Sequence, residues 1–261
     1  MSLAAEVEKG LETDIVGRRL NYFNEVESTN SVATEMADDG AAEGTVIIAE
    51  MQTHGKGWMG RRWISPKDGV WISVILRPRM SPAHAYRLTI AAGLAVAKTI
   101  RSYGIDARVK WPNDVIIGEK KVCGVLTEIE AEIANLRYAI VGIGVDVNVD
   151  TDLFPEEIRV GSTSLKAELE HPVDRVEFLQ RLFATLEYEY LRVKKDNFQA
   201  VLNDWRHMLA TVGKRVQINT PTKTIYGEAI GVDSEGSLIV ECKGGFLEKV
   251  VAGECIHLER A

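Results

Sequence analysis

The spacing of apolar residues divides most of the chain into alternating strands and helices. Residues 45–50 and 70–76 are short apolar runs, which are typical of buried strands. Residues 81–103 begin with Ser-Pro and carry apolar residues at helical spacing, which predicts a long helix that packs on a sheet. A capping-box pattern at 174–177 begins a second long helix, and residues 197–209 form a third.

The pattern also predicts a hairpin and a change of architecture near the C-terminus. The segments 121–129 and 138–149 pair as an antiparallel hairpin, with Asn135 in the turn. After Ala210, short strands alternate with glycine-bearing turns, which is typical of a small all-β barrel. We therefore predict an α/β (α+β) fold, with a mixed sheet and helices over residues 1–209 and a β barrel over 210–261.

Composition and charge narrow the class of protein. The 261 residues are 46% apolar and 26% charged, which suits one large domain with a small one. A net charge of -7 argues against a nonspecific nucleic-acid binder, and no apolar run is long enough for a membrane span. The three cysteines are far apart and fit neither a disulfide framework nor a zinc site, so we expect a reducing cytoplasm and assign no metal ligands.

The loop between the first two apolar runs carries the most conspicuous chemistry. Within 52–63, three glycines alternate with basic and aromatic residues and spell GxGxxG, but no helix is predicted after it, so the pattern does not indicate a dinucleotide site. Glycine allows close backbone approach, the basic side chains suit phosphate oxygens, and the tryptophans offer flat faces for a ring. The side chains concerned are Lys56, Arg61, Arg62, Trp58 and Trp63. The alternative is a flexible, basic surface hairpin.

Four further polar groups each have a functional and a plain interpretation. Ser28, Thr29 and Asn30 can bind a ligand or serve as a helix N-cap. Asn113 and Asp114 follow a pre-proline tryptophan and can read a ribose, an adenine edge or a metal, or simply form a turn. Lys121 can neutralise a phosphate or face water, as can its neighbour at 120. Asp146 and Asn148 share a strand face by the two-residue period, either toward a ligand or toward water.

Two features of this inventory favour one kind of chemistry. Glycines at 124, 142 and 144 interrupt the predicted strands, which indicates that something approaches the sheet closely. Donors and cations outnumber bases, and no Ser/His/Asp arrangement is present. The residues therefore favour binding and activation at a phosphate over hydrolysis by a side-chain nucleophile.

Five motifs, taken in order, resemble those of biotin–protein ligases. They are Glu27-Ser-Thr-Asn30, Gln52-Thr-x-Gly-Lys-Gly-x-x-Gly-Arg-x-Trp63, Lys110-Trp-Pro-Asn-Asp114, Lys121-x-x-Gly-x-Leu-x-Glu128 and Gly142-x-Gly-x-x-x-Asn148. Order, spacing and the trailing β barrel all agree. The resemblance implies a domain related to class II aminoacyl-tRNA synthetases, followed by an SH3-like barrel.

The resemblance also implies the reaction and the site. The family makes biotinyl-5′-AMP from biotin and ATP with Mg²⁺, and then transfers biotin to one lysine of a carboxylase carrier protein. By the same resemblance, biotin binding falls to Ser28, Thr29, Asn30, Gln52, Lys56, Gly57, Trp58, Lys121 and Gly124, ATP binding to Lys56, Arg61, Trp63, Asn113, Asp114, Lys121 and Asn148, and catalysis to Lys121, Asp114 and Lys110. Asp114 is our hypothesis for the group that helps the acceptor lysine to lose its proton.

Three positions depart from the family pattern. Trp58 stands where a second basic residue is common, Asp146 stands where asparagine is common, and Lys56 replaces arginine and so loses a bidentate fork. About twenty residues precede the motifs, too few for the winged helix of the repressor members, so we expect a monofunctional ligase without an N-terminal DNA-binding domain. Homodimers are common in the family, and no nucleic-acid or membrane partner is expected.

Two alternatives stay open from the sequence. A lipoate–protein ligase shares the fold and the adenylate chemistry, but the Gly-Lys-Gly loop and the Lys-Trp-Pro-Asn-Asp motif favour biotin. A non-catalytic, biotin-binding regulator would be favoured by loss of the catalytic lysine, whereas Lys121 is present.

Overall fold

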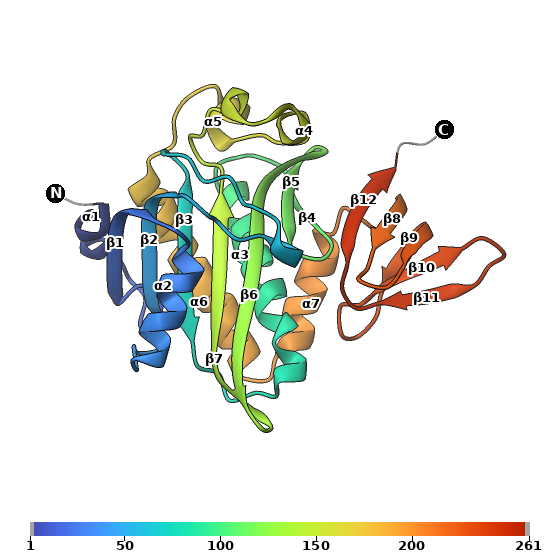
Figure 1. Ribbon diagram of the computed structural model, residues 1–261, viewed down its shortest axis with the longest axis horizontal. Helices are drawn as coiled ribbons and strands as arrows, with labels where there is room; N and C mark the ends of the chain where they lie inside the picture. The colour runs from blue at the N-terminus through green and yellow to red at the C-terminus, as the bar shows by residue number, and fades with distance from the viewer. Residues whose placement is uncertain (1–2, 259–261) are drawn as a thin grey trace.

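A seven-stranded mixed sheet forms the centre of the larger part of the molecule (Figure 1), in a computed structural model that describes residues 3–258. Along the sheet the order is β1-β2-β3-β7-β6-β5-β4; β1 and β2 are parallel and every other pair is antiparallel. The strands are β1 (Arg19–Val26), β2 (Thr45–Gln52), β3 (Val70–Leu76), β4 (Ala107–Lys110), β5 (Asp114–Ile117), β6 (Lys120–Glu132) and β7 (Asn135–Val145).

Helix α2 (Thr29–Asp38) connects the two parallel strands and covers one face of the sheet. Its buried Ala33 and Ala37 pack with Ile47, Ile75 and Ile140 from three neighbouring strands. Because successive strand residues point to opposite faces, their apolar neighbours face the other side. The central strands are therefore apolar on both faces, as the uninterrupted runs in the sequence predicted.

Three long helices pack over the other face, behind the sheet in Figure 1. They are α3 (Tyr86–Arg101), α6 (Arg175–Lys194) and α7 (Phe198–His207), and the short α1 (Leu3–Lys9) also packs on α6. The predicted helix start is confirmed at Asp174, whose side chain accepts hydrogen bonds from the backbone N–H groups of Val176 and Glu177. The Glu177 carboxylate pairs with Arg181 instead of closing a capping box. No helix of the described residues is both long enough and apolar enough to cross a membrane.

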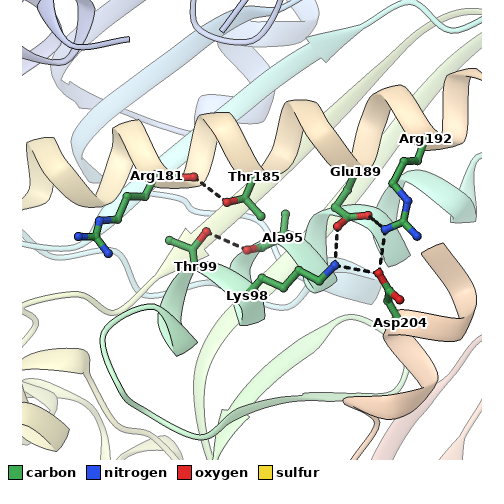
Figure 2. Close-up of polar contacts among 8 residues, drawn as sticks. All are labelled: Ala95, Lys98, Thr99, Arg181, Thr185, Glu189, Arg192 and Asp204. Carbon is green, nitrogen blue, oxygen red and sulfur yellow. Dashed lines mark hydrogen bonds and ion pairs between the residues drawn. The ribbon is translucent and has the colours of Figure 1, made fainter. Parts of the chain in front are cut away.

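A buried carboxylate ties these three helices together (Figure 2). Glu189 of α6 is fully buried and accepts hydrogen bonds from Lys98 of α3 at 2.8 Å and from Arg192 at 2.7 Å. Asp204 of α7 accepts from the same two cations at 2.9 and 2.8 Å. Burial raises the pKa of Asp204, but the hydrogen bonds from Lys98 and Arg192 outweigh it and leave that pKa below its ordinary value. Each of these charges therefore has two opposite partners.

The C-terminal part is a five-stranded antiparallel sheet, which confirms the predicted small β domain. Two hydrogen bonds from Trp111 anchor it to the larger part: the backbone N–H donates to Thr211 Oγ1 at 3.0 Å, and the indole N–H donates to the Gly236 carbonyl at 3.1 Å. The strands, in the order β11-β10-β9-β8-β12, are β8 (Arg215–Asn219), β9 (Thr224–Val232), β10 (Leu238–Cys242), β11 (Leu247–Val250) and β12 (Glu254–Leu258).

Local boundaries differ from the predicted ones at three places. Ser81 makes no side-chain cap, because Pro82–His84 is a 3-10 turn and α3 begins only at Tyr86. Asn135 is the first residue of β7, and the turn is made by Ile133, whose φ is 53°, and the residue after it. The sequence pattern also missed β5 and several short helices, namely η1 (Trp58–Gly60), η3 (Thr151–Leu153), α4 (Glu156–Arg159) and α5 (Leu165–Leu169).

Candidate active site

One cavity of about 490 Å³ gathers the sequence motifs. Its walls come from the start of α2, the β2–β3 connection, strands β5, β6 and β7, the loop after α4, and β12 of the C-terminal sheet. In Figure 1 the β2–β3 connection passes in front of the sheet. The cavity is lined by Ser28, Thr29, Asn30, Gln52, Lys56, Gly57, Trp58, Arg61, Trp63, Lys110, Asn113, Asp114, Lys121 and Gly124, so the structure brings all the predicted site residues together except Asn148.

Neutral polar side chains line the end of the cavity beside α2. The Thr29 N–H donates to Gln52 Oε1 at 2.8 Å, and Gln52 Nε2 donates to Ser65 Oγ at 2.8 Å. Ser28 stands at the N-cap position of α2, but its side chain makes no capping hydrogen bond. Ser28 therefore does not act as a side-chain cap; it lines the cavity, and its hydroxyl has no side-chain partner among residues 3–258.

Asn30 is buried, and both ends of its amide are fixed. Ser73 Oγ donates to Asn30 Oδ1 at 2.6 Å, and Asn30 Nδ2 donates to Glu128 Oε2 at 2.7 Å. Ser73 is fully buried on β3, and sequence reasoning missed it; a serine within an otherwise apolar strand was the only available signal. The result is a set of rigid donors and acceptors suited to a small polar ring such as a urea group.

Gly142 leaves the space that Asn30 occupies. A Cβ at Gly142 would lie 2.2 Å from Asn30 Oδ1. We expect Gly142→Ala to displace the Asn30 amide. It should weaken binding of biotin, the ligand that the motif resemblance implies, by about tenfold or more, because overpacking costs about 1–3 kcal/mol. Titration calorimetry with biotin measures this effect.

Gly93 supplies the matched control. It lies in α3, and an added Cβ would meet its nearest neighbour at 3.9 Å, which is ordinary contact. Gly93→Ala should leave biotin affinity unchanged. Equal biotin affinity in Gly142→Ala and the wild type would contradict the assignment of Asn30 to the ligand.

The Trp63 ring packs against the face of the sheet at the centre of the cavity. Its ring lies against Gly124 of β6 and Gly144 of β7, where added Cβ atoms would approach it to 3.2 and 2.3 Å. It also meets Trp71 edge-on at 6.4 Å between centroids. The strand glycines therefore admit an aromatic ring, as their positions in the sequence indicated. The Trp63 Nε1–H is buried and has no hydrogen-bond partner among the described residues.

Lys121 and Asp114 form the charged centre of the cavity. They lie on adjacent strands, β6 and β5, with Lys121 Nζ 2.7 Å from Asp114 Oδ1. The ammonium group is also 4.9 Å from the centroid of the Trp63 ring. Lys120 is exposed, whereas Lys121 points inward, so the alternative in which both lysines face water is wrong for Lys121. A cation held between a carboxylate and an aromatic face is positioned for an incoming anion.

Asp146 and Asn148 do not share a face, contrary to the two-residue period. Strand β7 ends at Val145, and the chain then turns, so the alternation no longer applies. Asn148 bonds Val173 through both ends of its amide, at 2.8 and 2.9 Å, and lies outside the cavity lining. Asp146 lines the cavity instead, and burial raises its pKa well above the ordinary value although the nearby Lys121 lowers it.

The C-terminal sheet contributes one wall, which sequence reasoning did not foresee. Glu254 of β12 pairs with Arg61 of the β2–β3 connection, with Arg61 Nη2 donating to Glu254 Oε2 at 2.6 Å. Cys255 is buried beside it, and burial raises the pKa of its thiol to about 12. A thiol that stays protonated at neutral pH is a poor nucleophile, so Cys255 does not supply covalent catalysis.

The rest of the β2–β3 connection covers the cavity loosely. Lys56 is exposed and lies 3.9 Å from Glu128, and the Gly57 N–H donates to the Arg61 carbonyl at 2.7 Å. Trp58 is half-buried at the cavity edge. The Asn113 side-chain N–H donates to the Val125 carbonyl at 2.7 Å, and this hydrogen bond fixes the turn that carries Asp114.

These groups define what the cavity can do. Neutral donors and acceptors stand at one end. The Trp63 ring, two glycines and Lys121 lie at the centre, and the cations Arg61 and Lys110 lie at the other end. The described residues contain no cluster of three or more histidine, cysteine or acidic side chains that would hold a metal ion alone. The arrangement fits a two-part ligand with a small polar ring and a polyanion, and it favours chemistry at a phosphate.

Comparison with known proteins agrees with this reading of the site. Residues 22–146 match the Biotin/lipoate A/B protein ligase family, and residues 211–258 match the Biotin protein ligase C terminal domain. With the relatives described next, these matches show that the chain belongs to the Biotin/lipoate A/B protein ligase family, which confirms the resemblance found in the motifs.

Two relatives and one solved structure are similar to the chain over most of its length. The chain is 35% identical to the bifunctional ligase/repressor BirA of Bacillus subtilis over 96% of its own length and 77% of that protein. It is 31% identical to the biotin–[acetyl-CoA-carboxylase] ligase of Mycobacterium tuberculosis, over 96% and 95% of the two chains. The structure of biotin protein ligase from Aquifex aeolicus in complex with biotin and ATP superposes with a TM-score of 0.79 at 28% identity, over 92% of this chain and 98% of that one.

Proposed function

We propose that the chain is an ATP-dependent biotin–protein ligase. It joins biotin to ATP as biotinyl-5′-AMP with release of pyrophosphate, and then transfers biotin to a lysine of a biotin carboxyl carrier domain, which forms a carbon–nitrogen bond. The observation that carries this proposal is that the Lys121–Asp114 pair and the Thr29–Gln52 hydrogen-bonding group line the same cavity. The names of the similar proteins support it.

In the first step, the biotin carboxylate attacks the α-phosphorus of ATP. Both reactants are anions, so the barrier falls when cations mask their repulsion and stabilise the charge on the phosphoryl oxygens. Lys121 is placed for this role at the centre of the cavity, with Arg61 and Lys110 on the nucleotide side. Asp114 fits a Mg²⁺ ion that arrives with the nucleotide, since Mg²⁺ is usually held by one or two carboxylates and substrate phosphates and neutralises phosphate charge.

The remaining residues divide between the two substrates in our proposal. The polar end holds the biotin ring, the β2–β3 connection closes over the ligand, and the Trp63 ring and the turn at Asn113 serve the nucleotide. Biotin is assigned to Ser28, Thr29, Asn30, Gln52, Lys56, Gly57, Trp58 and Gly124, with Asp146 in place of Asn148 on the nucleotide side. Closure of the connection would exclude water from the mixed anhydride, which water otherwise hydrolyses.

In the second step, the acceptor lysine must lose a proton before its nitrogen attacks the acyl carbon, because its reference pKa is about 10.4. Asp114 is the carboxylate beside Lys121, and we propose that it accepts a hydrogen bond from the incoming ammonium group. We expect Asp114→Asn to slow biotin transfer from preformed biotinyl-5′-AMP by about 10²-fold, as for loss of a general base.

Preformed biotinyl-5′-AMP keeps this test independent of ATP and Mg²⁺. Single-turnover transfer to a purified carrier domain is the measurement, and Glu119→Gln is the control. Glu119 also lines the cavity, but it pairs with Lys214 at 2.8 Å rather than with Lys121. Transfer at the wild-type rate by Asp114→Asn would remove the proposed role of Asp114.

Biotin-dependent exchange of pyrophosphate into ATP tests the function as a whole. Exchange with biotin, and none with lipoate or octanoate, is the expected result. Exchange with lipoate instead would show the alternative, a lipoate–protein ligase. Biotin binding without any exchange would point to a non-catalytic regulator.

Partner, assembly and location extend the proposal. The carrier domain of a biotin-dependent carboxylase is the protein substrate, as the name of the Mycobacterium tuberculosis relative indicates for that protein. We propose a homodimer. The outer part of β6, residues 126–132, supports it, because this part pairs with no strand on its β5 side among the described residues. Sedimentation equilibrium measures the oligomeric state and so tests this proposal.

The free cysteines, Cys123, Cys242 and Cys255, support location in a reducing cytoplasm. We place the boundary between catalytic and C-terminal domains at 209/210.

A further inference from the structure

Glu254 connects the C-terminal sheet to the nucleotide side of the cavity. Its carboxylate accepts hydrogen bonds from both terminal guanidinium nitrogens of Arg61, one of them at 2.6 Å. It also accepts a hydrogen bond from the Asn219 side-chain N–H at 3.1 Å. Glu254 and Arg61 both line the cavity that contains Lys121 and Asp114. The bidentate contact thus spans two parts of the protein at the site where a polyanion is expected.

The pair is poorly explained by stability alone. The Arg61 side chain is 61% exposed, whereas that of Glu254 is 25% exposed. Exposed ion pairs contribute little to folding because water screens them and two long side chains must be ordered. The two parts of the protein are already joined by the buried hydrogen bonds of Trp111 with Thr211 and Gly236.

The chemistry of the pair points to an exchange. A guanidinium group binds carboxylates and phosphates through the same planar pair of N–H donors. The hydrogen bonds from Arg61 lower the pKa of Glu254, so this carboxylate is anionic at neutral pH and competes directly with a phosphate. After Arg61 departs, Glu254 keeps the Asn219 hydrogen bond and the attraction of Lys110, so its charge is not left without compensation.

We propose that Glu254 is a positioning residue that holds the Arg61 guanidinium beside the nucleotide site and yields it to a phosphate of ATP. The C-terminal sheet thereby senses nucleotide binding, since its β12 strand loses an ion pair each time ATP enters. This inference rests on the proposed function, because it takes the polyanion in the cavity to be ATP.

Glu254→Gln tests the exchange, because it keeps the shape of the side chain and removes the competing charge. We expect ATP to bind about fivefold more tightly to Glu254→Gln than to the wild type, which is the scale of one exposed ion pair. The KM for biotin should not change. Calorimetric titration with ATP and the two KM values from pyrophosphate exchange are the measurements, and Glu254→Asp should restore the weaker, wild-type-like binding of ATP.

Glu248→Gln is the matched control within the same sheet. Glu248 forms an ion pair with Lys223 on the C-terminal sheet and does not line the cavity. Its variant should bind ATP as the wild type does. Unchanged or weaker ATP binding by Glu254→Gln overturns the exchange, and a loss shared equally by ATP and biotin would show a structural role instead. If the wild type binds no ATP, the proposed function falls together with this inference, so the two failures are distinguishable.

Discussion

Replacing Lys121 with glutamine should lower the rate of biotin-dependent pyrophosphate exchange by about 10²–10³-fold. The Lys121 ammonium lies 2.7 Å from Asp114 and 4.9 Å from the centroid of the Trp63 ring, so it is held where, in our proposal, the two substrates meet. Glutamine retains most of the side-chain length but carries no positive charge for the phosphoryl oxygens. The fall should appear mainly in kcat, because charge stabilisation grows as the transition state forms.

Lys120 provides an internal control one residue away. It begins β6, is exposed to solvent and does not line the cavity, so Lys120→Gln should exchange pyrophosphate at the wild-type rate. Lys121 also anchors the chain through its backbone, which bonds Gly161 at 2.7 Å and Thr163 at 2.9 Å. The substitution leaves those contacts intact, and an unchanged unfolding midpoint would verify this. A similar rate for both variants would refute the assigned role of Lys121.

Local sequence signals predicted the long strands and helices of the fold, and they failed for short elements whose structure depends on distant partners. The apolar run at 70–76 is strand β3 with the same bounds, and the predicted N-cap Asp174 precedes α6. By contrast, α4 and α5 are four and five residues long, and the connection between them pairs with β6 at Lys121. A segment whose structure depends on a distant strand carries little signal in its own sequence.

The candidate site shows the same division. Fourteen residues that the motifs predicted for the site line one cavity. The motifs could predict this because the residues of a family motif are neighbours in space as well as in sequence. Asn148 was misplaced by a period that holds only inside a strand, and β7 ends at Val145. Ser73 and Glu254 gained roles from partners far away in the chain, Asn30 and Arg61, and neither partnership leaves a local pattern.

Glu189→Ala should destabilise the fold by about 3–5 kcal/mol, the largest stability effect that we expect from a single side chain. Glu189 is fully buried, and it balances Lys98 and Arg192, whose side chains are only 29% and 15% exposed (Figure 2). Without it, two cations share Asp204 as their remaining partner, and a partly buried charge without sufficient compensation is costly. Urea unfolding, followed by circular dichroism, measures the change in the free energy of unfolding.

Glu177 tests whether burial, rather than ion pairing itself, determines this cost. It lies on the same helix as Glu189 and pairs with Arg181, but the two side chains are 48% and 42% exposed. Glu177→Ala should therefore cost only about 0.3–0.5 kcal/mol, as for other exposed pairs one turn apart. Equal losses in the two variants would mean that burial of Glu189 adds nothing. None of the residues in the Glu189 network lines the cavity, and the network acts through the packing of α3, α6 and α7. The KM for biotin should therefore stay unchanged in both variants at temperatures well below unfolding.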